Sequence, residues 1–350
     1  MQQIPTSAEG LPAPVLALED LRTHFATREG VVKAVDGVSF SIRPGETLCV
    51  VGESGSGKSI TARSIMGILQ KPGKVVGGRM TFRRKGGALV DLARLAPKGL
   101  TYRRIRGGEI GMVFQEPMSS LSPVHTIGSQ IAEVAKIHMG LSRRAALDRA
   151  AEVLDSVGFP SARERLGAYS FQLSGGMRQR VAIAMALACE PSLLIADEPT
   201  TALDVTTQAT ILDLLRNLTE TRGMALLFIT HDLGVVAEIA DSVVVMYLGE
   251  VAERGPVENV LDRARHPYTE GLIRCIPDAS SRGEMATIPG IVPHPLARPP
   301  GCPFNTRCTA ALPGVCDREA APVTSFTDGS AVACHLWSTR GRRALEAAHA

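Results

Sequence analysis

Short runs of apolar residues, separated by polar and glycine-rich segments, recur along most of this 350-residue chain. The runs Leu16–Leu21, Val31–Val35 and Val38–Ile42 have a β-like pattern and predict an antiparallel sheet near the N-terminus. Further strand candidates lie in Gly77–Val90. Mainly apolar segments predict buried core strands at Thr47–Val51, Ile110–Phe114, Ser192–Ala196, Ala225–Thr230 and Ser242–Tyr247.

Segments with helical character lie between these strands. Residues 128–157 are rich in Ala, Leu, Glu and Arg, with apolar residues three and four positions apart, which is typical of helices. Because strands and helices alternate, we expect an α/β fold with a mainly parallel sheet covered on both faces. Helices are also predicted at Ser59–Leu69, Met177–Ala188, Thr207–Thr221 and Leu233–Ala240.

Composition divides the chain into three parts. Residues 1–14 are polar and carry proline, which predicts a flexible lead-in. Residues 15–262 form the predicted main domain, and about 116–172 within it form a helical subdomain. Over residues 263–350 the composition changes to Pro, Gly, Cys and Arg with weak periodicity, which predicts a small C-terminal extension.

Charge and hydropathy argue against several classes of protein. The formal net charge is +3, from 38 basic and 35 acidic residues, which is too small to indicate nucleic-acid binding. No stretch approaches the ~18 uninterrupted apolar residues of a transmembrane helix. No basic region followed by an apolar one marks a secretory signal. We therefore expect a cytoplasmic chain whose role at a membrane comes through partners.

A glycine-rich loop follows the predicted strand Thr47–Val51 and reads Gly-Glu-Ser-Gly-Ser-Gly-Lys-Ser at 52–59. Glycines let the backbone curl until several N–H groups point at one phosphate, and the following helix adds its positive end. Lys58 supplies a charge to the β- and γ-phosphates, and the Ser59 hydroxyl ligates Mg²⁺. The predicted nucleotide contacts are Gly52, Ser54, Gly55, Ser56, Gly57, Lys58, Ser59 and Ile60.

Two acids end the apolar strand that reads Leu-Leu-Ile-Ala-Asp-Glu at 193–198. Asp197, at the strand tip, is placed to hold Mg²⁺ through water. Glu198, one residue further, is placed to polarise an attacking water molecule as a general base. Together with the glycine loop, this pair predicts hydrolysis of a nucleoside triphosphate.

Four of the seven cysteines lie between residues 302 and 334, with the spacing C-x5-C-x7-C-x17-C. In a cytoplasmic chain such a group is better explained by metal than by disulfides. The spacing is neither a zinc-ribbon pair nor a common ferredoxin run, so an iron–sulfur cluster, zinc and free thiols stay open. His335 is a possible alternative ligand. The other three cysteines, Cys49, Cys189 and Cys275, are expected to act as small buried hydrophobes.

The order of these motifs resembles the nucleotide-binding subunits of ABC transporters over about residues 15–260. The most specific part is Leu-Ser-Gly-Gly-Met-Arg-Gln-Arg at 173–180. The resemblance implies a P-loop NTPase of ABC type, with a mainly parallel sheet, an antiparallel β subdomain and a helical subdomain. The other motifs that carry it are Gly52–Ser59, Gln115, Leu193–Glu198, Ala202-Leu203-Asp204 and His231.

The same resemblance implies roles for residues that carry no signal alone. Gln115 would link Mg²⁺ to a transmembrane partner, and His231 would contact the γ-phosphate. ATP would lie between the glycine loop of one subunit and the signature turn (Ser174, Gly175 and Gly176) of a second, head-to-tail subunit. Asp204 would bridge the two sites. Phe25 is the candidate for stacking on adenine, with an ordinary core phenylalanine as the alternative.

Three further segments resemble the ATPase subunits of dipeptide and oligopeptide importers, a group that also includes nickel importers. They are residues 266–277, which begin His-Pro-Tyr, residues 288–308 and residues 116–123. Some members of this group carry a [4Fe–4S] cluster at matching cysteines. The resemblance therefore implies Cys302, Cys308, Cys316 and Cys334 as cluster ligands, with zinc as an alternative.

This resemblance implies an ATPase that powers import of dipeptides or oligopeptides. Its implied partners are a second ATPase subunit, identical or different, two transmembrane permease subunits and an extracytoplasmic substrate-binding protein, with no nucleic acid. The chain would lie peripherally on the cytoplasmic face of the inner membrane. Nickel or another small solute is the alternative cargo. A soluble non-transport ABC ATPase is disfavoured by the single set of motifs and the ~115-residue gap between glycine loop and signature.

Overall fold

The computed structural model describes residues 12–115, 121–201, 203–276, 287–339 and 341. Its largest element is an eight-stranded sheet with the strand order β11-β12-β10-β9-β3-β8-β7-β6. The strands that pair in parallel are β3 (Thr47–Val51), β6 (Ile110–Val113), β7 (Leu193–Asp197), β8 (Ala225–Ile229) and β9 (Ser242–Tyr247).

The parallel strands confirm the core strands predicted from apolar runs. In β7, Leu193 and Ile195 join one hydrophobic core, whereas Leu194 and Ala196 join the other. Because successive side chains point to opposite faces, a strand covered on both sides needs an apolar residue at every position. That is why the sequence shows continuous apolar runs here.

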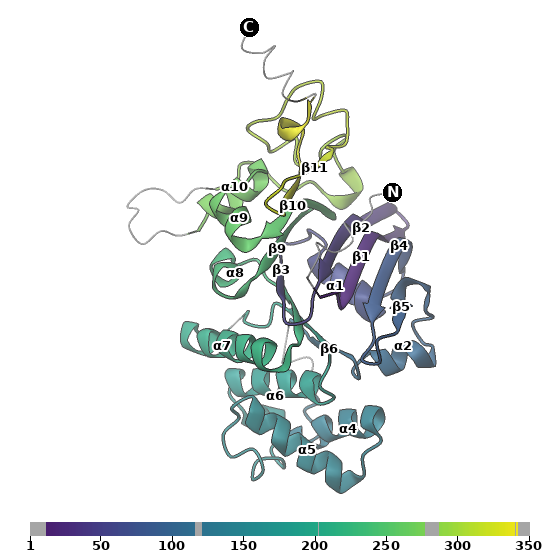
Figure 1. Cartoon of the computed structure of the whole chain (residues 1–350), viewed down its shortest axis with the longest axis vertical. Coiled ribbons are helices and arrows are strands. Elements are labelled where there is room, and N and C mark those ends of the chain that lie inside the picture. The colour runs from purple at the N-terminus through teal and green to yellow at the C-terminus, as the bar shows by residue number, and fades with distance from the viewer. Residues whose placement is uncertain (1–11, 116–120, 202, 277–286, 340, 342–350) are drawn as a thin grey trace.

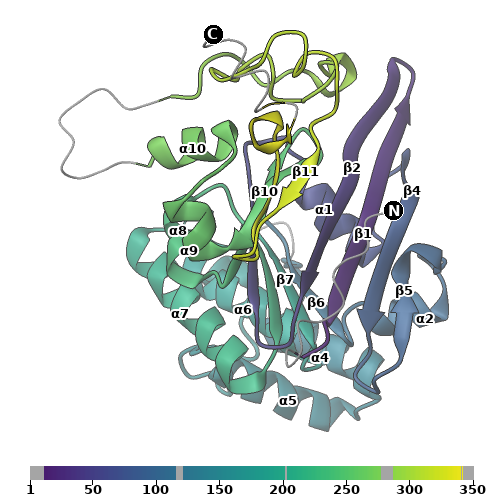
Figure 2. The same cartoon turned by 45° about the horizontal axis from the view of Figure 1, so that its top comes forward.

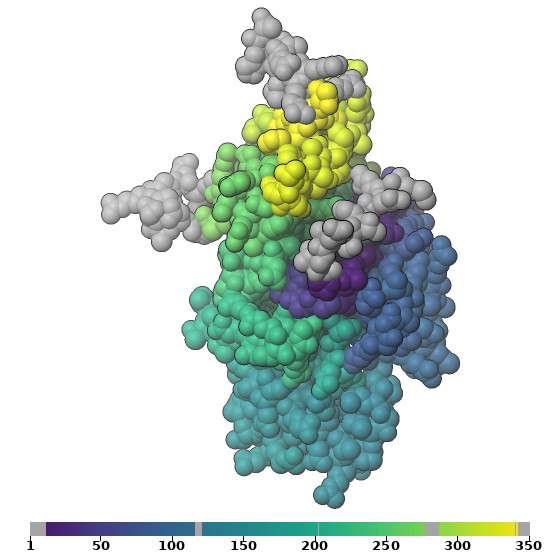
Figure 3. Space-filling view, in the orientation of Figure 1, coloured from purple at the N-terminus to yellow at the C-terminus, as the bar shows by residue number. Residues whose placement is uncertain are grey.

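The C-terminal extension continues the large sheet. β10 (Glu250–Pro256) pairs antiparallel with β9, and β12 (Ala331–Ala333) and β11 (Val323–Ser325) extend the sheet antiparallel from β10. Phe304 lies in the same hydrophobic core as the parallel strands. Figure 3 shows the extension, coloured from green to yellow, in direct contact with the preceding part of the chain. The boundary at 262/263 stays a prediction.

A second sheet is antiparallel throughout, with the order β2-β1-β4-β5. Gly37 bulges out of β2 with φ of 86°, between Asp36 and Val38, which both pair with β1. The two apolar runs predicted on either side of Gly37 are therefore parts of one strand. The strands are β1 (Leu16–Thr27), β2 (Gly30–Ile42), β4 (Gly73–Arg83) and β5 (Leu89–Asp91).

The helical character predicted for residues 128–157 is confirmed, and two helices share that region. Gly140 adopts φ of 67° and ends α4, and the Ser142 hydroxyl caps α5 by accepting the Ala145 N–H at 3.3 Å. The α-helices are α1 (Lys58–Met66), α2 (Leu100–Ile105), α4 (Ile127–Met139), α5 (Arg143–Ser156), α6 (Gly175–Leu187), α7 (Val205–Arg222), α8 (Leu233–Ile239), α9 (Val257–Asp262) and α10 (Pro267–Arg274).

The helices form layers around the two sheets (Figures 1 and 2). α1 packs between the sheets, where Ala62 and Ile65 share a core with both of them. The pair α4 and α5 lies at the end of the molecule farthest from the extension. In the described part of the chain, every helix is too short or too polar to cross a bilayer. Short 3-10 turns are η1 (Leu92–Arg94), η2 (Ser170–Gln172), η3 (Pro295–Ala297) and η4 (His335–Trp337).

Candidate functional site

The glycine loop joins β3 to α1, and its shape depends on glycine at two positions. Gly52 has φ of 148° and Gly57 has φ of 101°. A Cβ on Gly52 would overlap the Met246 carbonyl oxygen, and one on Gly57 would overlap that of Ala34. The first N–H groups of α1 have no side-chain cap, because Gly57 occupies the N-cap. The loop and the helix start therefore present backbone donors suited to an anion.

Two side chains of the loop are arranged for a phosphate. Ser56 Oγ is buried without a hydrogen-bond partner. Lys58 Nζ donates to the carbonyl oxygens of Gly52 at 2.6 Å and Glu53 at 3.1 Å. Burial lowers the pKa of Lys58, although nearby carboxylates act in the opposite direction. An unpartnered hydroxyl and a buried ammonium in one loop fit the oxygens of a nucleotide phosphate.

A serine–aspartate contact connects α1 with β7. Ser59 Oγ donates to Asp197 Oδ1 at 2.8 Å. Burial raises the pKa of Asp197, and the Ser59 hydrogen bond partly offsets that effect. Hydroxyl and carboxylate oxygens are suited to Mg²⁺, which takes its other ligands from water and phosphate. The pair therefore fits the Mg²⁺ role expected from the sequence.

Glu198 is the centre of a polar cluster at the ends of three neighbouring strands. Gln115 follows β6 and donates from Nε2 to Glu198 Oε2 at 3.0 Å. The Thr201 hydroxyl donates to the same oxygen at 3.1 Å. His231 follows β8, with Nδ1 3.4 Å from Glu198 Oε1. Since the carboxyl ends of parallel strands share one edge of a sheet, residues 115, 198 and 231 meet there.

The backbone of Glu198 adopts the left-handed region, with φ of 47°. This conformation is uncommon for residues with a side chain and is found where the surroundings impose it. Here the Glu198 N–H donates to the carbonyl oxygen of Ile229 at 2.9 Å. The neighbouring strand thus turns the carboxylate towards Gln115 and His231.

The signature turn and Asp204 begin two adjacent helices. Ser174 caps α6 by accepting the Met177 N–H at 3.4 Å, and Asp204 caps α7 by accepting the Thr207 N–H at 3.0 Å. The Thr207 hydroxyl also donates to Asp204, and this hydrogen bond lowers the pKa of Asp204. A Cβ on Gly176 would lie 2.7 Å from Thr207 Cγ2. Ser174, Gly175 and Asp204 are all exposed.

Parts of two predicted motifs fall outside the described residues. These are residues 116–120 of the importer-like segment and Ala202 of the Ala-Leu-Asp motif.

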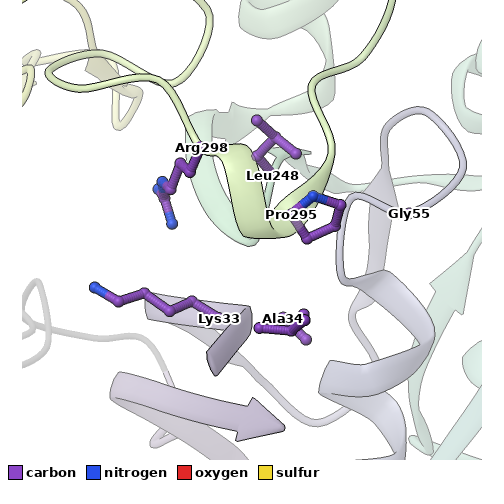
Figure 4. Close-up of a pocket in the computed structure, with 7 residues that line it drawn as sticks. Lys33, Ala34, Gly55, Leu248, Pro295 and Arg298 are labelled. Atoms are coloured by element: carbon purple, nitrogen blue, oxygen red, sulfur yellow. The ribbon is translucent and has the colours of Figure 1, made fainter. Parts of the chain in front are cut away.

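A pocket of about 140 Å³ lies beside the glycine loop (Figure 4). One wall comes from β2 and another from η3 of the C-terminal extension. Phe25 pairs with Val32 on β2 and packs against β4, where its ring occupies the space of a Cβ on Gly73. Its stacking on adenine stays a prediction. The pocket is lined by Val32, Lys33, Ala34, Gly55, Leu248, Pro295 and Arg298.

None of the four clustered cysteines forms a disulfide. Cys302, Cys316 and Cys334 are buried, and Cys308 is half-buried. Burial raises the pKa of Cys302 to about 11 and that of Cys334 to about 12. Among the described residues, no three His, Cys, Asp or Glu side chains are grouped to hold a metal ion. A [4Fe–4S] or zinc site is therefore not shown in the described residues, and both stay predictions.

The imidazole of His335 is held at one nitrogen, since Nε2 lies 3.0 Å from the Glu319 carbonyl oxygen. Its role as an alternative metal ligand through Nδ1 stays a prediction.

A phosphate-binding glycine loop, a Ser–Asp pair suited to Mg²⁺ and a carboxylate at the strand ends are the parts of a P-loop nucleotide hydrolase. Residues 35–201 match the ABC transporter family, and residues 252–316 match the C-terminal region of oligopeptide/dipeptide transporters. A putative peptide import ATP-binding protein of Brucella abortus is 53% identical over 332 residues, which cover 93% of this chain and 97% of the relative.

The dipeptide transport ATP-binding protein DppD of Bacillus subtilis is 46% identical over 333 residues, covering 95% of this chain and 97% of the relative. A dimeric ATP-binding cassette, MJ0796, solved in a post-hydrolysis state with ADP and Pi, has a TM-score of 0.60 and 29% identity. That match covers 69% of this chain and 98% of the cassette. The chain belongs to the ABC transporter family, as an ATP-binding cassette.

Proposed function

We propose that this chain hydrolyses ATP to power the import of dipeptides and oligopeptides by an ABC transporter. The observation that carries this function is the meeting of Gln115, Glu198 and His231 beside the Ser59–Asp197 pair. The match to named peptide import proteins along 97% of their length supports peptide as the cargo over nickel.

The residues around the glycine loop suit binding of MgATP. The loop N–H groups and Ser56 Oγ would donate to phosphate oxygens. Lys58 would exchange its two carbonyl partners, on Gly52 and Glu53, for the β- and γ-phosphates. Ser59 and Asp197 would hold Mg²⁺, which neutralises charge that develops on the phosphates.

The cluster around Glu198 suits activation of water. A carboxylate 13% exposed and held by Gln115 and Thr201 keeps one orientation, and it can accept a proton from water that attacks the γ-phosphate. His231 is 60% exposed and lies on the open side of this carboxylate, where it would contact the γ-phosphate. Positioning and charge stabilisation supply most of the rate in such transfers.

The exposed signature turn needs a ligand from outside this chain. Ser174 and Gly175 lie at the N-terminus of α6, a 13-residue helix, where N–H groups and the helix dipole favour an anion. We infer that the turn closes over ATP held by a second, head-to-tail ATPase subunit. Asp204, exposed at the start of the neighbouring helix α7, would bridge the two sites.

The remaining assignments are proposals that family membership supports. We propose residues 15–262 as the nucleotide-binding domain and residues 263–350 as the peptide-importer extension. The cassette would dock on two transmembrane permease subunits at the cytoplasmic face of the membrane, and an extracytoplasmic binding protein would deliver peptide. The second ATPase subunit is either another copy or a similar chain.

Lys58→Ala tests the function in the assembled transporter. Because the variant lacks the charge for the phosphates, ATP binding, ATP hydrolysis and uptake of labelled dipeptide should all be lost. Lys98→Ala, at an exposed position away from the site, should keep all three. ATP-driven uptake of labelled Ni²⁺ in place of peptide would overturn the cargo, and full activity of Lys58→Ala would overturn the site.

Metal analysis of anaerobically purified protein decides between the [4Fe–4S] cluster that the family resemblance implies, a zinc site and free thiols. A [4Fe–4S] cluster requires about four irons and four sulfides per chain, lost in Cys302→Ser. One zinc per chain would replace the cluster prediction with a structural zinc site. If the wild-type protein contains neither iron nor zinc and melts at the same temperature as Cys302→Ser, both metal sites are refuted.

A further inference from the structure

The second residue of the glycine loop, Glu53, is held by the C-terminal extension at two places. The Glu53 backbone N–H donates to the Tyr268 hydroxyl at 2.8 Å. Arg307 donates from Nη1 to Glu53 Oε2 at 2.7 Å and from Nη2 to Oε1 at 3.1 Å. These partners lie 215 and 254 residues away in sequence. Residues of the C-terminal extension, outside the nucleotide-binding motifs, therefore hold the glycine loop.

Contacts other than the one with Glu53 hold the Arg307 side chain in place. Its side chain is 4% exposed, and its Nε donates to the Pro289 carbonyl oxygen at 3.0 Å. The guanidinium lies 5.8 Å from the Tyr247 ring centre and 5.9 Å from that of Phe304. A planar fork held in this way forms two parallel hydrogen bonds with a carboxylate, which a lysine cannot reproduce.

Tyr268 is equally constrained, and it belongs to the His-Pro-Tyr segment singled out by the sequence. It is fully buried, with ring centres 4.7 Å from Tyr247 and 5.3 Å from Phe304. His266 Nδ1 accepts the Tyr268 N–H at 3.0 Å. Burial lowers the pKa of His266 to about 4, so the ring is neutral and able to accept. The segment thereby aims the tyrosine hydroxyl at the glycine loop.

Glu53 also contacts the site itself, because its carbonyl oxygen accepts from Lys58 Nζ at 3.1 Å. One residue thus joins the extension to the lysine of the loop. The same stretch of the extension supplies Pro295 and Arg298 to the pocket beside Gly55 (Figure 4). The extension therefore contacts the glycine loop through Glu53 and also walls the pocket next to it.

We propose that Tyr268 and Arg307 are positioning residues for nucleotide binding, which hold Glu53 so that Lys58 and the loop N–H groups face the phosphates. This inference rests on the proposed function, because it assumes that the glycine loop binds MgATP. According to this proposal, the C-terminal extension contributes to ATP binding. Loss of either contact loosens the loop without removing any group that touches ATP.

The first test is the affinity of the full-length chain for MgATP, measured by calorimetry. Tyr268→Phe removes one hydrogen bond and should weaken binding about 3- to 10-fold. Arg307→Met leaves Glu53 without its partner and should weaken binding by roughly 10-fold or more. Glu53→Gln, which is nearly isosteric and faces solvent in part, should have a similar effect. The double variant Glu53→Gln/Arg307→Met should be no worse than the weaker-binding single variant.

The second test separates positioning from simple stability. Hydrogen exchange of residues 52–57 should speed up in Tyr268→Phe and Arg307→Met. In the assembled transporter, KM for ATP should rise more than kcat falls, because Glu198 and its partners are untouched. Arg265→Met is the matched control. Arg265 is also in the extension, pairs with Asp328 at 2.7 Å and packs against Phe326, but it has no part in the glycine loop.

Arg265→Met should lower the melting temperature while keeping MgATP affinity and loop exchange at wild-type values. Equal loss of affinity in Arg265→Met and Arg307→Met would overturn the inference, since any damage to the extension would then act alike. Wild-type affinity in both Tyr268→Phe and Glu53→Gln would also overturn it. Normal MgATP binding by Lys58→Ala would contradict the proposed function. If Lys58→Ala loses binding while Tyr268→Phe, Arg307→Met and Glu53→Gln bind MgATP normally, the inference alone is contradicted.

Discussion

Glu198→Gln should leave MgATP binding intact and slow ATP hydrolysis by the assembled transporter by about 10²–10⁴-fold. The amide has nearly the same shape as the carboxylate and can still accept from Gln115 and Thr201, which donate to Glu198 at 3.0 and 3.1 Å. It cannot take the proton of the attacking water, because a neutral amide does not act as a base near neutral pH. Single-turnover hydrolysis and equilibrium nucleotide binding measure the two effects separately.

Glu190→Gln is the matched control for this variant. Glu190 also has a left-handed backbone, with φ of 51°, and its carboxylate pairs with Arg149 at 2.8 Å; it precedes β7, whereas Glu198 follows it. This variant tests whether replacing an ion-paired glutamate with a left-handed backbone is by itself enough to lower the rate of ATP hydrolysis. Its hydrolysis rate should equal that of the wild type. Near-normal turnover of Glu198→Gln would assign the general base to another group.

Ser174→Arg should lower steady-state ATP hydrolysis about 100-fold or more, in the range found when preorganised donors to a transition state are lost. The bulky cation fills the exposed turn and removes the hydroxyl cap of α6. The isolated chain should still bind MgATP with wild-type affinity, since its own glycine loop is unchanged. ATP-dependent association of subunits, followed by sedimentation, should disappear.

Ser142→Arg provides the comparison, because Ser142 is also an exposed serine that caps a helix, here α5. Losing either cap costs about 1 kcal/mol of stability, so the two variants should melt alike. Only Ser174→Arg should lose hydrolysis. If the isolated Ser174→Arg chain fails to bind ATP, the turn acts within its own subunit and the cross-subunit role is wrong.

The parallel strands could be predicted from the sequence, because a strand that is buried on both faces is a continuous apolar run. β3 and β9 occupy the predicted ranges Thr47–Val51 and Ser242–Tyr247 without change. The helical region 128–157 was less readable, since Gly140 and Ser142 divide it in two. Composition and periodicity respond weakly to one left-handed glycine, whereas helix geometry ends there.

The candidate site was predicted in part. Sequence reasoning identified Glu198, Gln115 and His231, and the structure brings their side chains into contact. It missed Thr201, which also holds the Glu198 carboxylate. A threonine three residues after a glutamate is a weak local signal, but such a spacing at a strand end is compatible with a side-chain hydrogen bond.

By itself, the sequence determined the parts of this protein whose chemistry is local. A phosphate loop needs glycines next to Lys58 and Ser59, and a strand end needs Asp197 and Glu198 in succession, so these groups appear as contiguous motifs. Only the tertiary structure decided which distant residues support them. The contact between Glu53 and Arg307 spans 254 positions and joins two segments with no shared pattern, because it depends on how the extension packs on the sheet.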